Sequence, residues 1–196
     1  MVIVGLRVHE SRSRHRAFAE GVRATWAEAA TILGAVDADY AAYHADLADR
    51  LFVRPLLDDT TDPHTAAFLD AHTAAHVAAY ESQPLDGALA ETAVSTARAA
   101  REAWNIASRH ARNAGLQIEP RKRSKLALAR KLLNQALDPT ITDEYRDNLL
   151  DRITALIAQA GASRIPPVRA MVADAVIRQL DAGSPRQLTR GVGGSC

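Results

Sequence analysis

Two histidines in the stretch AHTAAHVAAY have the spacing that most directly indicates chemistry. His72 and His76 are four positions apart, so on a helix both imidazoles project from one face, as the ligands of metal-binding helices do. The candidate metal ligands are therefore His72 and His76. Four residues are candidates for a third ligand, provided that the fold brings one of them near the two histidines: Asp70, His64, His44 and Glu81.

The same pair has a simpler interpretation, as two surface histidines on an alanine-rich helix. Thr73 stands where the helical metalloprotease motif has its glutamate, so that motif is absent. The chain also lacks a glycine-rich phosphate loop, a dinucleotide-binding fingerprint and a nucleophile elbow. These observations favour a non-enzymatic protein without excluding an enzyme, and they predict no cofactor.

The run RKRSKLALARK at residues 121–131 is the second segment whose composition indicates a ligand. Clustered lysines and arginines release counterions from nucleic acid, and this term supplies much of the binding affinity. The competing interpretation is a solvated helix face, because exposed ion pairs contribute only about 0–1 kcal/mol each. A smaller cluster, RSRHR at residues 12–16, could extend the same footprint. The candidate nucleic-acid contacts are Arg121, Lys122, Arg123, Lys125, Arg130 and Lys131.

Charge is segregated along the chain, although the formal net charge is only +1. Residues 31–91 carry two basic and eleven acidic side chains, whereas residues 92–136 carry ten basic and two acidic ones. In one interpretation these blocks face each other within the chain or simply solvate their own helices. In the other they pair between subunits, as in an assembly module that forms homo-oligomers.

Alanine-rich amphipathic runs separated by short breaks predict an all-α protein of about seven helices in two groups. Asp62, Asp86 and Thr142 are predicted to cap helices. Residues 2–8, VIVGLRV, have the β-branched density of a strand. We expect them to form an extended arm on the helices or a strand paired with a second copy. The predicted helices cover residues 11–33, 37–52, 63–82, 86–115, 121–137, 143–160 and 167–181.

The predicted organisation is a helical domain at residues 1–115, which contains the acidic block 31–91, and a three-helix region at residues 116–182 with a basic leading helix. Residues 183–196 read as a disordered tail. The boundary falls at LQIEP, because Pro120 moves Glu119 out of the helical region. Cys196, the only cysteine, lies in the tail, so an internal disulfide and a cysteine metal site are excluded.

Nothing in the sequence indicates a membrane segment. No stretch approaches the roughly 18–20 consecutive apolar residues that span a bilayer. The opening MVIVGLRV is too short for a secretory signal and lacks a basic region before its apolar run. We therefore expect a cytoplasmic protein without a membrane partner.

Residues 131–161, KLLNQALDPTITDEYRDNLLDRITALIAQAG, place a D-P-x-x-T loop between two helices, of which the second holds an arginine, a leucine-rich stripe and a closing glycine. This arrangement resembles a small two-helix domain of unknown function common in actinobacteria and their phages and plasmids. The resemblance implies a helical hairpin and a setting in such genomes, and it supplies no activity. The positions that carry it are Leu132, Leu133, Ala136, Asp138, Pro139, Thr142, Arg146, Leu156 and Gly161.

Three hypotheses for function follow from these patterns. The first is an accessory or regulatory helical protein that contacts DNA or RNA through the six cations of residues 121–131. The second is an interaction module that assembles into homo-oligomers through complementary charge blocks. The third is a helical metal-binding protein that uses His72 and His76.

Overall fold

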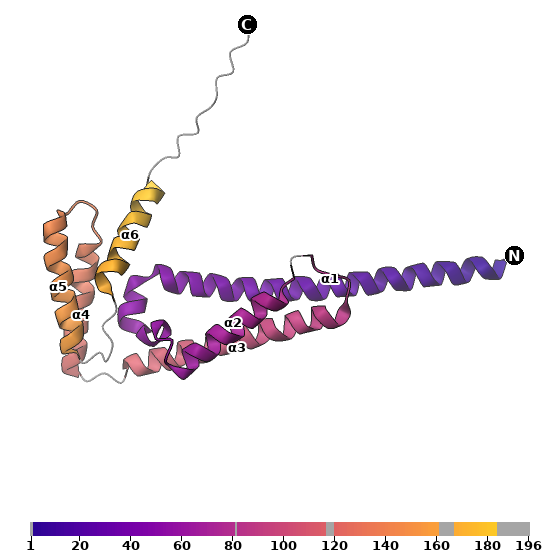
Figure 1. Ribbon diagram of the computed structural model, residues 1–196, viewed down its shortest axis with the longest axis horizontal. Coiled ribbons are helices and arrows are strands. Elements are labelled where there is room, and N and C mark those ends of the chain that lie inside the picture. The colour runs from indigo at the N-terminus through magenta and orange to yellow at the C-terminus, as the bar shows by residue number, and fades with distance from the viewer. Residues whose placement is uncertain (1, 81, 117–119, 161–166, 184–196) are drawn as a thin grey trace, which may run out of the picture. The chain divides into compact units, whose positions relative to one another are not determined.

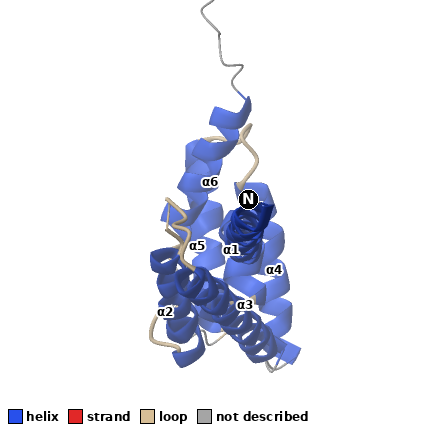
Figure 2. Ribbon diagram, turned by 90° about the vertical axis from the view of Figure 1, so that its right-hand side faces the viewer, coloured by secondary structure: helices blue, strands red, loops and turns tan. Residues whose placement is uncertain are grey.

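The computed structural model of the chain describes residues 2–80, 82–116, 120–160 and 167–183. These residues form six α-helices, with a π-helical and a 3₁₀ segment between the first two. Within these ranges no strand occurs (Figure 2). The prediction of an all-α fold is therefore confirmed. None of the described helices combines the length and the apolar character needed to cross a membrane.

The chain divides into two compact units, residues 1–117 and residues 118–196. The first unit contains α1 (Val2–Ala45), η1 (Asp49–Val53), η2 (Pro55–Asp58), α2 (Pro63–Ala78) and α3 (Gly87–Leu116). The second contains α4 (Pro120–Ala136), α5 (Asp143–Gln159) and α6 (Val168–Gly183). The tail predicted at residues 183–196 lies, from residue 184 onward, outside the described residues.

Helix α1 corrects the prediction for the N-terminus. Residues 2–8 are neither an extended arm nor a strand, because they form the first turns of a single 44-residue helix. Valine and isoleucine lower helix stability by only a few tenths of a kcal/mol each, and an adjoining helix can extend through them. In Figure 1 the N-terminal part of α1 reaches past the ends of α2 and α3.

Helix α1 also continues through Gly34, where we predicted the end of a first helix. A glycine inside a helix costs about 1 kcal/mol relative to alanine. On α1 the buried face resumes directly after it, with Val36 and Tyr43 both almost fully buried. Burial of these side chains outweighs the cost of the glycine. The helix predicted at residues 11–33 and the first part of the one predicted at residues 37–52 are therefore one helix, which ends at Ala45, and the remainder of the second prediction includes the separate segment η1.

The first unit is organised around α3, which packs against both α1 and α2. Most of the buried side chains of α3 are alanines, including Ala90, Ala97 and Ala100. Small side chains on one helix let larger ones from its neighbours fill the interface. Trp104 is the large exception on α3, and it joins an aromatic cluster with Tyr40, Tyr43 and Phe68.

The helix starts follow the predicted capping residues. Asp62 and Asp86 accept hydrogen bonds from backbone N–H groups in the first turns of α2 and α3. Thr142 does the same for α5. Each side chain satisfies donors that have no partner inside the helix. The three predicted N-caps are confirmed.

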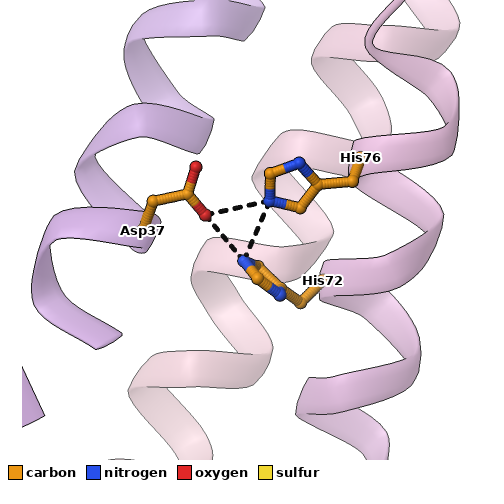
Figure 3. Close-up of side chains that lie close together, drawn as sticks. All are labelled: Asp37, His72 and His76. Atoms are coloured by element: carbon orange, nitrogen blue, oxygen red, sulfur yellow. Dashed lines mark hydrogen bonds and ion pairs between the residues drawn. The ribbon is translucent and has the colours of Figure 1, made fainter. Parts of the chain in front are cut away.

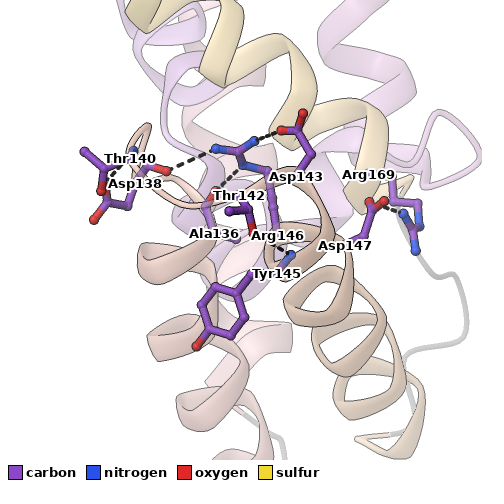
Figure 4. A network of polar contacts seen from close by, with 9 residues as sticks. All are labelled: Ala136, Asp138, Thr140, Thr142, Asp143, Tyr145, Arg146, Asp147 and Arg169. Carbon is purple, nitrogen blue, oxygen red and sulfur yellow. Dashed lines mark hydrogen bonds and ion pairs between the residues drawn. The ribbon is translucent and has the colours of Figure 1, made fainter.

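In the second unit α4 packs against α5, and a short polar loop joins them. Asp138 accepts hydrogen bonds from the backbone N–H and the hydroxyl of Thr140. Arg146 donates to the backbone carbonyls of Ala136 and Asp138, at 3.1 Å each, and to the carboxylate of Asp143 at 2.6 Å. Figure 4 shows this one guanidinium joining the end of α4, the loop and the start of α5.

Candidate metal centre

The two predicted metal ligands meet a carboxylate from another helix. The Oδ1 atom of Asp37 lies 2.7 Å from Nε2 of His72 and 3.0 Å from Nε2 of His76. The two Nε2 atoms are 3.2 Å apart. Figure 3 shows Asp37 reaching from α1 toward the two histidines of α2. Among the described residues this is the group of three side chains whose arrangement suits a metal ion.

Local packing explains why the side chains point to one place. His72 follows Phe68 by one helical turn, on the side of α2 that faces the aromatic cluster. The His72 imidazole packs against the rings of Phe68 and Tyr40, with centroids 5.4 Å and 5.7 Å away. These contacts fix the orientation of the ring and direct its Nε2 atom toward α1. His76 lies one turn further along the same face.

The site lies at the protein surface, where an ion from solution can enter. The exposed fractions of the side chains are 17% for His72, 42% for Asp37 and 49% for His76. Its inner ligand is thus held by packing while its outer ligands face water. All three residues belong to the acidic block at residues 31–91, whose net negative charge attracts cations.

Two opposing effects act on the Asp37 carboxyl. Partial burial by itself raises its pKa, because burial disfavours the charged form. Hydrogen bonds with His72 and His76, together with the charges of those rings, outweigh burial and hold the pKa of Asp37 below its ordinary value of 3.8. Asp37 is therefore ionised near neutral pH, as a carboxylate must be to bind a metal.

The distances between the ligand atoms fit a small metal ion. In tetrahedral zinc sites the metal–ligand bonds are about 2.0–2.1 Å long, which places the ligand atoms about 3.3 Å from one another. The three observed separations are 2.7, 3.0 and 3.2 Å. An outward movement of the ligand atoms by a few tenths of an ångström would complete the geometry.

The structure brings Asp37 to the histidine pair, and Asp37 is not among the four third ligands that the sequence suggests. His44 packs against the rings of Tyr40 and Tyr43. His64 packs against His110 with the two rings tilted, and their centroids are 4.3 Å apart. Asp70 is exposed on α2, and Glu81 lies outside the described residues.

Asp37 was identified from the sequence only as the start of a helix. It is separated from His72 by 35 residues and from His76 by 39. No spacing rule connects residues on two helices, since their alignment depends on how both pack against α3. The available signal was the position of Asp37 next to Val36, at the edge of the buried stripe of α1.

The six cations predicted to bind nucleic acid all lie on α4, but they do not share one face. Arg123, Arg130 and Lys131 are exposed, and they lie opposite the buried stripe formed by Ala129, Leu132, Leu133 and Ala136. Lys122 and Lys125 are half-buried and lie on the same side of the helix as that stripe, seven and four residues before Ala129. Arg121 belongs to α4, but its side chain lies outside the described residues.

Part of the segregated charge is paired within the chain. Arg98 of α3 forms an ion pair with Glu28 of α1, and Arg101 forms one with Asp39. Both pairs cross the interface between α1 and α3. Of these two pairs, only Arg101–Asp39 joins the basic block to the acidic block at residues 31–91, because Glu28 lies outside that block.

Comparison with known proteins adds no information about the function of this site. No family model, no curated protein and no solved structure matches the chain. The resemblance of residues 131–161 to a two-helix domain therefore stays a prediction.

Proposed function

We propose that this protein binds a divalent transition-metal ion between α1 and α2, with Asp37, His72 and His76 as its ligands. The convergence of three ligand atoms within 3.2 Å of one another supports this proposal most directly. Two imidazole nitrogens and a carboxylate oxygen suit zinc and its neighbours in the first transition row. Carboxylate-only sites for calcium or magnesium use a different donor set.

A metal ion satisfies this group of atoms better than protons do. Both Nε2 atoms approach the same carboxylate oxygen and also each other. Each Nε2 atom carries either a hydrogen or a lone pair, so no placement of protons makes all three contacts favourable at once. One cation accepts a lone pair from each of the three atoms simultaneously.

The bound ion would cross-link the N-terminal unit. Helices α1 and α2 both pack on α3, and a metal held by Asp37 on one side and by two histidines on the other would join them directly. Three protein ligands leave a fourth position for water, because the outer ligands face solvent. The proposed function is therefore metal-dependent stabilisation of the three-helix arrangement.

Zinc binding to the full chain tests this proposal. Metal-free protein, prepared with a chelator, should bind one zinc ion per chain in isothermal titration calorimetry. At a free zinc concentration of about 100 times Kd, the folded state should gain about 2.7 kcal/mol, which corresponds to an increase of roughly 10 °C in the melting temperature of a unit of this size.

Matched variants locate the site. H76Q and D37N should each weaken zinc binding by about 100-fold or more, because loss of a ligand exceeds the effect of losing an outer-shell partner. H15Q and D70N remove an exposed histidine and an exposed carboxylate elsewhere in the same unit, and they should bind zinc as the wild type does. Equal affinity in all four variants would contradict the proposal.

A second candidate function, association with nucleic acid, is favoured by the composition of α4. The 17 residues of this helix include no acidic side chain, and three of its cations share the exposed face: Arg123, Arg130 and Lys131. A helix face that carries several cations suits contacts with the phosphate backbone rather than the reading of a particular sequence.

The salt dependence of binding tests this second candidate. If the three exposed cations each contact a phosphate, the triple variant R123Q/R130Q/K131Q should reduce the slope of log K against log salt by about 3 for duplex DNA. The control R23Q/R152Q/R178Q removes the same charge from other exposed positions. Absence of DNA and RNA binding at low salt, or the same slope in both variants, would reject this function.

A further inference from the structure

A groove with a volume of about 530 Å³ lies on the N-terminal unit, apart from the candidate metal ligands. Helices α1 and α3 and the segment that follows η1 supply its lining. A groove of this size is in the range of small-molecule sites, which enclose roughly 300–1,000 Å³. None of its lining residues is assigned a role in metal binding.

Arg54 lines the groove, and neighbouring side chains hold its guanidinium in place. Its guanidinium forms an ion pair with Asp49 and donates to the Ser108 hydroxyl at 3.2 Å. The same group lies over the rings of Tyr43 and Trp104, 5.1 Å and 5.6 Å from their centroids. Because Asp49 balances its charge and only 13% of the side chain is exposed, Arg54 provides a rigid base.

The wall contributed by α3 carries two positive charges that the described residues leave uncompensated. Arg109 and Arg112 both line the groove and are exposed, and neither forms an ion pair with a described residue. Arg101 and Asp39, by contrast, neutralise each other at the α1 side. Since Arg109 and Arg112 are three residues apart on one helix, their guanidiniums can converge on a single anionic group.

The opposite end of the groove has a different character. Glu102 lies seven residues before Arg109, which is about 10 Å along the helix axis. Asn105 and Ser108 lie between them and line the groove as well. This end offers a carboxylate, an amide and a hydroxyl, which suit the hydroxyl groups of a polar ligand.

We propose that this groove binds the phosphate monoester of a small hydroxylated molecule, such as a sugar phosphate. Arg109 and Arg112 hold the phosphate, and Glu102 and Asn105 accept or donate hydrogen bonds to the hydroxyl groups. A phosphate monoester carries a charge of about −1.5 to −2 near neutral pH, which matches two arginines. A free phosphate ion would leave most of the groove unfilled.

Calorimetric titration of the full chain with glucose-6-phosphate, inorganic phosphate and glucose tests the proposal. Glucose-6-phosphate should bind with a Kd in the millimolar range or below, more tightly than inorganic phosphate, and glucose should not bind measurably. Absence of saturable binding of glucose-6-phosphate up to about 10 mM would overturn the proposal. Equal affinity for the ester and for inorganic phosphate would also overturn it, because the groove would then not hold the organic part.

Variants at exposed positions locate the site. R109Q/R112Q should weaken binding of glucose-6-phosphate about tenfold or more, whereas R16Q/R23Q, which removes the same charge from the exposed surface of α1, should leave it unchanged. R109K/R112K keeps the charge but loses the two-pronged geometry, so its affinity should fall between those of the wild type and the glutamine variant. If R109Q/R112Q alters the melting temperature, the affinity of R109K/R112K for glucose-6-phosphate becomes the deciding measurement. Unchanged affinity in the lysine pair and the glutamine pair would overturn the assignment.

Discussion

Asp37 on α1 and His72 on α2 are joined by a contact of 2.7 Å between Oδ1 and Nε2, across 35 residues of sequence. His76 approaches the same oxygen from one turn further along α2. The contact thus connects two helices that both pack on α3.

Acidification should weaken the metal-free protein through Asp37. Because the pKa of its carboxyl in the folded state lies below 3.8, the ionised group stabilises the fold above that value. This contribution is lost as the pH falls through the lower folded-state pKa. In chelator-treated protein, the difference in free energy of unfolding between wild type and D37N should therefore shrink as the pH falls from about 5 to about 3.

Urea unfolding at a series of pH values measures this difference. D70N serves as the control, because Asp70 is an exposed carboxylate on the same helix as the histidines. A difference between wild type and D37N that stays constant or grows toward low pH would show that the carboxylate is not stabilised in the folded state.

The ion pair of Arg54 should contribute far more to stability than the exposed pair of Arg98. Arg54 and Asp49 are 13% and 17% exposed, whereas Arg98 and Glu28 are 65% and 48% exposed. R54M leaves a largely buried carboxylate without its partner, and we expect a loss of about 2–3 kcal/mol. R98Q should change stability by less than about 0.5 kcal/mol. Denaturant unfolding compares the two, and equal effects would contradict the assignment of Arg54 as a rigid base.

Features set by neighbouring residues could be predicted from the sequence. Asp62, Asp86 and Thr142 cap helices through hydrogen bonds within three residues of themselves, so their types and positions were sufficient. The spacing of His72 and His76 likewise placed both imidazoles on one face of α2. These features depend on helix geometry alone.

Features that depend on packing between helices could not be predicted. Asp37 meets the histidines only because α1 and α2 lie against α3 in a particular alignment. The continuity of α1 through Gly34 depends on burial of Val36 and Tyr43 by other helices. Local propensity also favoured an extended conformation for residues 2–8, and the preference is too weak to oppose a long adjoining helix.

Arg146 should be a main contributor to the stability of the C-terminal unit. It donates to two backbone carbonyls and to Asp143, and its side chain is 15% exposed. R146Q should lower the free energy of unfolding by about 1.5–3 kcal/mol, since hydrogen bonds from a charged donor are lost. R152Q, at an exposed position on the same helix, should have little effect. Denaturant unfolding followed by circular dichroism distinguishes the two variants.

The alanines of α3 should be sensitive to added volume. Ala100 has no exposed surface and packs with Leu33, Ala75 and Ala97. A100L inserts a larger side chain between helices and should cost about 1–3 kcal/mol. The neighbouring A99L places the same side chain on an exposed position and should change stability by less than about 0.5 kcal/mol. If A100L were as stable as A99L in thermal unfolding, the close contact of α3 with its neighbours would be disproved.

X-ray absorption at the zinc K edge, measured on the zinc-loaded full chain, tests the metal site most directly because it counts imidazole ligands around the ion. The wild type and the H15Q control should each show two imidazole nitrogens at about 2.0–2.1 Å. H72Q and H76Q should each show no more than one. An unchanged number of imidazoles in all four proteins, or no zinc bound to the wild type, would contradict a metal centre at Asp37, His72 and His76.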